Sequence, residues 1–321
     1  MPTYNAMPFL PEAVGSILSQ SFDQFEFLIV NDGSTDGSKI YLDSLTDDRV
    51  RVIHQKNRGI VPALNIGIQE ARFDWIARMD ADDVALPHRF EKEVAFLERH
   101  PRYTLVSCAF GYIGTHSKRL KARHVQFLRS PPSYQPRLDP VILHQGVLYN
   151  RKAVVAVGSY REVKAAEDLD LWLRLDEACY QMASIPEILM LARVVPEGIS
   201  TKNFIEQRLG WKYALACSKA RETGANEPWQ NEFRQKYWPR GWKRIHVEGA
   251  RQFRLAGASW GANEYWRAGL RFFLSMVLRP RLAVSKFAIY FFNTRTLKAN
   301  SSSNSACEES AGGKKLNGYR I

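Results

Sequence analysis

Strand-like and helical stretches alternate through the first hundred residues, and this alternation limits the folds open to the chain. Three runs, residues 25–30, 49–53 and 75–79, are apolar or alternate polar with apolar side chains, as strands do. Each is followed by residues with helical spacing, up to about residues 45, 71 and 100. Strands separated by helices of this length pair in parallel through right-handed crossovers. We therefore predict an α/β fold with a mostly parallel sheet flanked by helices.

Three carboxylates, those of Asp80, Asp82 and Asp83, follow the third strand-like run directly. Carboxylates this close repel one another and cost solvation energy unless a cation neutralises them. Mg²⁺ accepts one or two carboxylates and completes its shell with water and substrate phosphates. The cluster predicts a site for a metal-bound phosphate or diphosphate. A solvated acidic turn remains the alternative, because Asp is a common turn residue.

Polar side chains follow the predicted strands where ligands of such folds bind. In open α/β sheets the ligand lies beyond the carboxyl ends of the strands. Tyr4-Asn5, Asn31-Asp32 and the stretch from Asp80 to Asp83 lie at three such ends. The sequence thus predicts that three polar clusters meet at one crevice.

Six segments together resemble the family 2 glycosyltransferases, which transfer sugars with inversion and have the GT-A fold. These segments are residues 1–5, 18–22, 25–38, 57–59, 79–83 and 166–174. The resemblance covers roughly residues 1–215. It implies transfer of a sugar from a nucleotide-diphosphate sugar, a UDP-sugar in our interpretation, to a hydroxyl of a glycan or lipid-linked acceptor. It further implies a Mg²⁺ or Mn²⁺ cofactor and a role in cell-surface polysaccharide or lipopolysaccharide synthesis.

The resemblance also implies roles for individual residues. By this resemblance, the residues that would contact the nucleotide sugar are Pro2, Thr3, Tyr4, Asp32, Arg58, Asp80 and Asp82. Tyr4 would stack on the base, unless it only fills the crevice wall, and Asp32 would hydrogen-bond the base. Asp82 and Asp83 would hold the ribose and the metal, and Asp80 would position the sugar or its ribose. Arg58 would bind a phosphate, although a solvated loop arginine fits as well.

Asp168 is the predicted general base. An inverting transfer needs a base on the acceptor side, and a carboxylate serves if its pKa is raised toward neutrality. The like charges of Glu167 and Asp170 and the apolar neighbours favour such a shift. An acidic helix start, stabilised by the helix dipole, is the simpler alternative. His144 and Trp172 are candidates for contact with the diphosphate or acceptor, or else for packing.

One departure from the family pattern concerns the amino terminus. Family members have an apolar strand before the segment that corresponds to residues 2–5, whereas this chain begins at Met1. We expect the first strand to be missing or to lie upstream of Met1.

The carboxyl-terminal part differs in charge from the rest. Residues 1–98 contain 9 Lys and Arg against 16 Asp and Glu, whereas residues 240–298 contain 12 against 2. We predict a catalytic domain at residues 1–215, a helical, basic and aromatic extension at 216–298, and a disordered tail at 299–321. Interleaved basic and aromatic residues suit an anionic membrane surface. No apolar run is long enough to span a bilayer.

Two other readings of function remain open. The chain could bind sugar nucleotides without transferring the sugar, or its basic extension could bind nucleic acid. The second leaves the acidic clusters unexplained, so we expect no nucleic-acid partner. The start has no signal-peptide pattern and the four cysteines have no metal-ligand spacing, which predicts a cytoplasmic protein. The basic and aromatic extension predicts that the protein lies at the inner face of the membrane.

Overall fold

The structure is a computed structural model that describes residues 1–115, 117, 142–195, 204–239, 248, 250–252, 255, 265–278 and 319–321. The chain forms two compact units. Unit 1 comprises Met1–Val194, Glu206–Lys236 and Gly318–Ile321, and unit 2 comprises Val195–Ile205 and Tyr237–Asn317. The division differs from the predicted boundary at residue 215, because that residue lies inside the continuous helix α8 (Phe204–Thr223).

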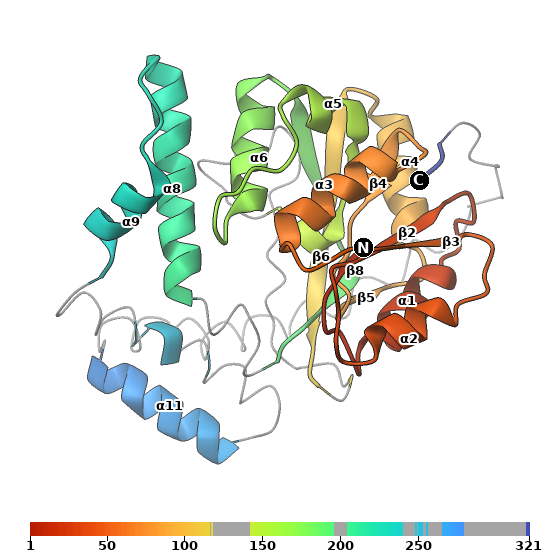
Figure 1. The fold of residues 1–321 in the computed structure, drawn as a ribbon, viewed down its shortest axis with the longest axis horizontal. Helices are drawn as coiled ribbons and strands as arrows, with labels where there is room; N and C mark the ends of the chain where they lie inside the picture. Colours follow the sequence, from red (N-terminus) through yellow and green to blue (C-terminus); the bar gives the residue numbers. More distant parts are fainter. Residues whose placement is uncertain are drawn as a thin grey trace, which may run out of the picture. The chain divides into compact units, whose positions relative to one another are not determined.

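The first sheet of unit 1 is parallel, as predicted. It has the order β1 (Pro2–Thr3), β2 (Phe27–Asn31), β3 (Val50–His54). Helices α1 (Leu10–Leu18), α2 (Ser38–Asp43) and α3 (Ile60–Glu70) connect or follow these strands (Figure 1). In α1 the apolar residues recur with helical spacing, so that Leu10, Val14 and Ile17 are buried on one face.

The second sheet is mixed. Its order is β4 (Trp75–Ala77), β7 (Val147–Asn150), β6 (Tyr103–Ile113), β8 (Gln181–Arg193), β5 (Val84–Ala85). Only β6 and β8 pair in parallel. The predicted strand before the Asp cluster is therefore present as β4, but it pairs antiparallel with β7 instead of extending the parallel sheet.

One cavity is lined by residues of both sheets. Its walls include Leu28 and Val30 of β2, Leu64 of α3, and Ile76 of β4. Met1 lies at the same cavity, and its backbone bonds Leu28 and Val30. The first strand of the sheet, β1, comprises only two residues, Pro2 and Thr3.

Three further helices contact the mixed sheet: α4 (Arg89–Arg99), α5 (Arg151–Ala156) and α6 (Glu167–Glu177), with a 3₁₀ turn, η1 (His144–Gly146). Helix α8 packs on α6, and α9 (Gln230–Tyr237) contacts α8. Helices α3, α5 and α6 share a core with β6 and β7, which includes Leu64, Leu105, Tyr149, Val154 and Trp172. This core fixes the start of α6 relative to the sheets.

The end of the chain corrects the predicted tail. Ile321 donates its N–H to the Gln24 carbonyl and accepts from the Glu26 N–H, at 3.2 and 2.8 Å. Tyr319 stacks at a tilt on Trp75. Residues 319–321 thus pack on unit 1, and the rest of the predicted disordered segment lies outside the described residues.

Unit 2 contains α11 (Tyr265–Leu278). Within the residues described, no helix combines the length and the apolar character needed to cross a bilayer. Residue 116 and residues 118–141 also lie outside the described residues.

Candidate functional site

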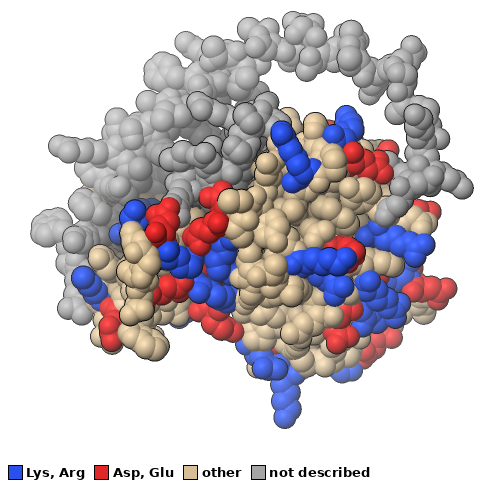
Figure 2. All heavy atoms as spheres, turned by 90° about the horizontal axis from the view of Figure 1, so that it is seen from above, with Lys and Arg blue, Asp and Glu red and all other residues tan. Residues whose placement is uncertain are grey.

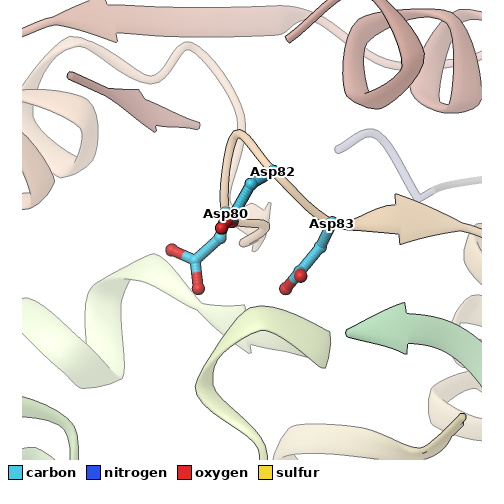
Figure 3. Close-up of side chains that lie close together, drawn as sticks. All are labelled: Asp80, Asp82 and Asp83. Atoms are coloured by element: carbon cyan, nitrogen blue, oxygen red, sulfur yellow. The ribbon is translucent and has the colours of Figure 1, made fainter. Parts of the chain in front are cut away.

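The Asp cluster occupies the turn between β4 and β5. The Asp83 N–H bonds the Asp80 carbonyl at 3.4 Å, which closes the turn. Carboxylate oxygens of Asp80, Asp82 and Asp83 lie within 4.8 Å of one another, and the Asp80 and Asp83 side chains point to the same side of the loop (Figure 3). Asp83 is buried, and its Oδ2 has no hydrogen-bond partner among the described residues. A buried carboxylate oxygen without a partner is costly unless a cation or donor approaches it.

Arg193, at the end of β8, holds this turn. Its N–H donates to Asp83 Oδ1 at 2.7 Å, and its Nε donates to the Asp82 carbonyl at 2.6 Å. The guanidinium also bonds the Gly114 carbonyl at 2.8 Å and Glu12 Oε2 at 2.5 Å. Arg193 was not predicted from the sequence, because the residue lies far from the Asp cluster in the chain and carries no local motif.

Arg78 places a buried positive charge beside the cluster. Its Nη2 lies 2.6 Å from Asp80 Oδ1, while Nε and Nη1 have no partner within the described part of the chain. Arg78 was also missed by the sequence analysis, although it directly precedes the Met79-Asp80 step. Its charge compensates part of the repulsion among the three carboxylates.

Asp82 and Asp83 nevertheless hold protons more tightly than ordinary carboxyls. Burial and the charge of Asp80 raise the pKa of Asp82 to about 6. Burial and the charges of both neighbours raise the pKa of Asp83 well above its usual range. These are hard oxygen ligands in a partly buried turn, which is a donor set that fits Mg²⁺ or Mn²⁺.

Tyr4 and Asn5 directly follow β1, at its carboxyl end. Tyr4 is 49% exposed. Asn5 accepts from the Thr35 N–H at 2.7 Å, and the Asn5 N–H donates to Ser34 Oγ at 3.0 Å. The loop after β2 therefore fixes the backbone next to Tyr4.

Asp32 holds the neighbouring loop in place. Its Oδ1 accepts from Gln55 Nε2 at 2.6 Å and from the Arg58 N–H at 2.8 Å, and its Oδ2 accepts from the Gly59 N–H at 2.8 Å. The Asp32 N–H in turn bonds the Thr3 carbonyl at 2.8 Å. Oδ2 keeps one acceptor position, since a carboxylate oxygen accepts two bonds. The Arg58 side chain is exposed at this loop.

Glu167 and Asp168 begin α6 and are half-buried. Burial raises the pKa of Asp168, although the Leu169 N–H, bonded at 2.7 Å, and the charge of Arg78 oppose the rise. Burial and the charge of Asp168 raise the pKa of Glu167 to about 7. Arg78 and Asp80 both act electrostatically on this pair, so the start of α6 lies within electrostatic range of the Asp cluster.

His144 and Trp172 lie below the surface of the site. The imidazole of His144 is buried, with Nε2 2.8 Å from the Tyr160 hydroxyl, and its ring meets Trp172 edge to face. Burial and the charge of Arg78 lower the pKa of His144 well below its usual range, so the ring is neutral. Trp172 is 1% exposed and belongs to the core. In this structure both side chains are buried.

A buried ion-pair network holds α6 from its other side. Asp170 accepts from Arg161 at 2.5 and 3.0 Å and from Arg174 Nε at 2.9 Å. Arg161 also bonds Glu227, which follows α8. Asp170 was predicted only as a like charge near Asp168, and the structure gives it this structural role.

The site thus combines a turn with three close carboxylates and a half-buried carboxylate pair at a helix start. The profile of Glycosyl transferase family 2 matches residues 1–158. EpsE of Bacillus subtilis strain 168, which carries a glycosyltransferase name, is 32% identical over 215 residues, 64% of this chain and 75% of EpsE. The amylovoran biosynthesis glycosyltransferase AmsE of Erwinia amylovora is 27% identical over 207 residues, with the same coverage. The chain belongs to glycosyltransferase family 2.

Solved structures confirm the GT-A fold. The mannosyltransferase PcManGT of Pyrobaculum calidifontis, solved with GDP-Man and Mn²⁺, aligns with a TM-score of 0.53 over 93% of this chain and 81% of its own, at 16% identity. S. aureus TarS 1–349, solved with UDP-GlcNAc, aligns with a TM-score of 0.54 over 86% of this chain and 89% of its own, also at 16% identity.

Proposed function

We propose that the protein transfers a sugar from a nucleoside-diphosphate sugar to an acceptor hydroxyl with inversion at the anomeric carbon. The observation that carries the proposal is the juxtaposition of two acidic groups with different environments. The Asp turn is a cation-binding donor set, and Asp168 is a half-buried carboxylate with a raised pKa within its electrostatic range. Groups whose environments separate their roles in this way are typical of acid–base sites.

The donor's nucleotide is assigned to the crevice beside β1 and β2. Tyr4 stacks on the base, and the backbone of Pro2 and Thr3 contacts the nucleotide. Asp32 accepts from the base through the free position on Oδ2. The exposed Arg58 side chain binds a phosphate. Two solved structures of this fold hold GDP-Man and UDP-GlcNAc, which supports a nucleoside-diphosphate sugar, and UDP is our preferred carrier.

A divalent cation is assigned to Asp82 and Asp83, with Asp80 beside them on the sugar or ribose. When bound, Mg²⁺ or Mn²⁺ stabilises the negative charge that develops on the departing diphosphate. The unpartnered Oδ2 of Asp83 and the spacing of the three carboxylates support this assignment.

Asp168 takes the proton of the acceptor hydroxyl as its oxygen attacks the anomeric carbon. The raised pKa suits this task, since a base is most effective when its pKa is near the working pH. The charge of Arg78 limits the rise in the pKa values of Glu167 and Asp168, because it favours the ionised forms of both carboxyls.

The acceptor is a glycan or lipid-linked molecule in cell-surface polysaccharide or lipopolysaccharide synthesis. AmsE, a relative of this chain, is named for the biosynthesis of such a polymer. A lipid-linked acceptor places the enzyme at the inner face of the cytoplasmic membrane.

A donor screen tests the proposal. The full chain is incubated with UDP-, GDP- and dTDP-sugars in Mg²⁺ or Mn²⁺, and release of the nucleoside diphosphate is measured. Donor binding with no release, with or without acceptor extracts, would favour a sugar-nucleotide-binding protein without transferase activity.

The nucleic-acid reading is weaker on the described residues. On the face seen in Figure 2, their Lys and Arg side chains are interspersed with Asp and Glu and form no continuous basic stripe. Salt-sensitive binding to generic DNA, together with no turnover of any donor, would reverse this preference.

A further inference from the structure

Helix α11 exposes its large apolar side chains. Leu270, Phe273, Leu274 and Val277 are between 38% and 62% exposed, whereas Ala268 and Ser275 on the same helix are buried. This is the reverse of α1, whose large apolar residues are buried. A helix that packs as an ordinary element buries its apolar face.

The four side chains form one stripe. Their positions follow the pattern i, i+3, i+4, i+7, which places them on one face of a helix. Contiguous exposed apolar surface of this kind marks an interaction site more often than it marks a bare surface. We therefore expect the stripe to bind a partner that offers an apolar surface or interior.

The charge near the stripe indicates which partner. Residues 265–298 contain seven Lys and Arg and no Asp or Glu. Two of them, Arg267 and Arg271, lie on α11 itself, and Arg267 is exposed. An apolar stripe with basic residues beside it matches a bilayer surface, where acyl chains lie beneath anionic phosphates. Since α11 has 14 residues, it fits the plane of the interface and not a span.

We propose that α11 is an in-plane membrane anchor that inserts the stripe of Leu270, Phe273, Leu274 and Val277 into a bilayer of anionic phospholipids. The proposal goes beyond the transferase reaction and does not depend on it. It assigns the membrane contact to one face of one helix, instead of to the charge of the whole extension.

Vesicle binding by the full chain tests this anchor. The protein is mixed with phosphatidylcholine vesicles with and without phosphatidylglycerol, and bound protein is separated by flotation. We expect stronger binding to the anionic vesicles, only partly reversed by high salt, because buried apolar area does not respond to screening.

Paired variants distinguish the stripe from general charge. Phe273→Ser with Val277→Ser should weaken binding to anionic vesicles by at least about tenfold, given the apolar area these side chains would bury. The matched control, Ile40→Ser with Val155→Ser, removes two exposed apolar side chains from unit 1 and should leave binding unchanged. Arg267→Gln with Arg271→Gln should reduce the preference for anionic over neutral vesicles.

Three results would contradict the proposal that α11 is a membrane anchor. The first two are failure of the unaltered chain to bind anionic vesicles and undiminished binding by the stripe variant. The third is that neither form binds lipid, and that light scattering shows a dimer for the unaltered chain and a monomer for the stripe variant, since a second copy would then cover the stripe. If Phe273→Ser with Val277→Ser does not fold by circular dichroism, Leu270→Ser with Leu274→Ser tests the same face. Donor turnover, measured separately without vesicles, reports on the proposed function alone.

Discussion

At the scale of single residues, the two acidic groups of the site have different tasks and should fail differently. The carboxylates of the Asp turn lie together, and the buried Oδ2 of Asp83 has no hydrogen-bond partner among the described residues, as suits a cation ligand. Asp168 lies at a helix start, where backbone N–H groups and the helix dipole favour its ionised form against burial. Substitution of each by the isosteric amide separates binding from proton transfer.

Asp168→Asn should lower the transfer rate constant by roughly 10²–10⁴-fold while donor affinity survives, because the amide keeps the size of the side chain but accepts no proton. Single-turnover kinetics with saturating donor measure this rate. Glu162→Gln, an exposed carboxylate shortly before α6, is the control and should be neutral. A loss of donor affinity at an unchanged rate would make Asp168 a donor contact instead.

Glu167→Gln should shift the acid limb of the activity–pH profile to lower pH. The base must be ionised, so activity falls as the pH drops through the apparent pKa of the Glu167–Asp168 pair. A neighbouring negative charge raises a carboxyl pKa, and its removal lowers the pKa of Asp168. The pH dependence of kcat/KM is the measurement, and a limb that stays in place or moves upward contradicts the coupling.

Asp82→Asn and Asp83→Asn should each reduce donor turnover by orders of magnitude and weaken Mn²⁺ binding, because an amide oxygen is a poorer ligand for a hard cation than a carboxylate. Calorimetric titration with Mn²⁺ gives a readout apart from activity. Asp48→Asn, on an exposed turn, is the matched control. Full activity of both site variants in a chelator would refute the metal assignment.

At the scale of elements, α6 is the part whose position matters most for the proposed chemistry. Its apolar side packs into the core through Leu171 and Trp172, and its buried Asp170 binds Arg161 and Arg174. Burial tends to raise the pKa of Asp170, but the hydrogen bonds and charges of the two arginines outweigh burial, and the pKa is lowered. The ion pairs therefore stabilise the folded state above the ordinary pKa of an aspartate and are lost as the pH falls through the lowered value.

Asp170→Asn should destabilise the protein by about 3–5 kcal/mol, because it leaves the buried Arg174 without its counter-charge. Denaturant unfolding near neutral pH measures the loss. Asp43→Asn breaks the exposed pair with Lys39 and should change stability little. If the two variants unfold alike, the network does not anchor α6.

Local sequence patterns predicted most of the helices and strands, but they could not predict which distant strands pair. The strands near residues 25–30 and 49–53, and the helices near 60–71 and 87–100, are confirmed as β2, β3, α3 and α4. Their signals lie within a few residues, in alternation and helical spacing. The antiparallel partner of β4 lies more than seventy residues away, as β7, and no local signal specified it.

The same limit explains which site residues were missed. The Asp cluster was visible because its members are neighbours in the sequence. Arg193 bonds the cluster from the end of β8, and only the pairing of β8 with β5 and β6 brings it there. The sequence left open whether Trp172 contacts the diphosphate or acceptor or packs, and the structure shows its side chain in the core.

At the scale of the whole molecule, the division into two units separates two kinds of interaction. Unit 1 contains the sheets and the predicted donor, metal and base residues, and unit 2 contains α11. The boundary was predicted at residue 215 because the family resemblance ends there. Helix α8 continues past that residue to Thr223. Contacts between the end of α8 and α6, such as Arg221 with Glu177, assign most of α8 to the catalytic unit.

The bonds of Arg193 also bear on ion size. One guanidinium ties the Asp82 backbone to the end of β6 and to Glu12 of α1, so the turn has little freedom to widen. Ca²⁺ needs bonds of about 2.3–2.6 Å to six or more oxygens, whereas Mg²⁺ takes about 2.0–2.1 Å and keeps several waters. A turn held this firmly should discriminate against the larger ion, so Ca²⁺ should support turnover poorly compared with Mg²⁺ or Mn²⁺. Arg193→Met should narrow that difference as it loosens the turn, and equal discrimination in the variant would mean that the carboxylates alone select the ion.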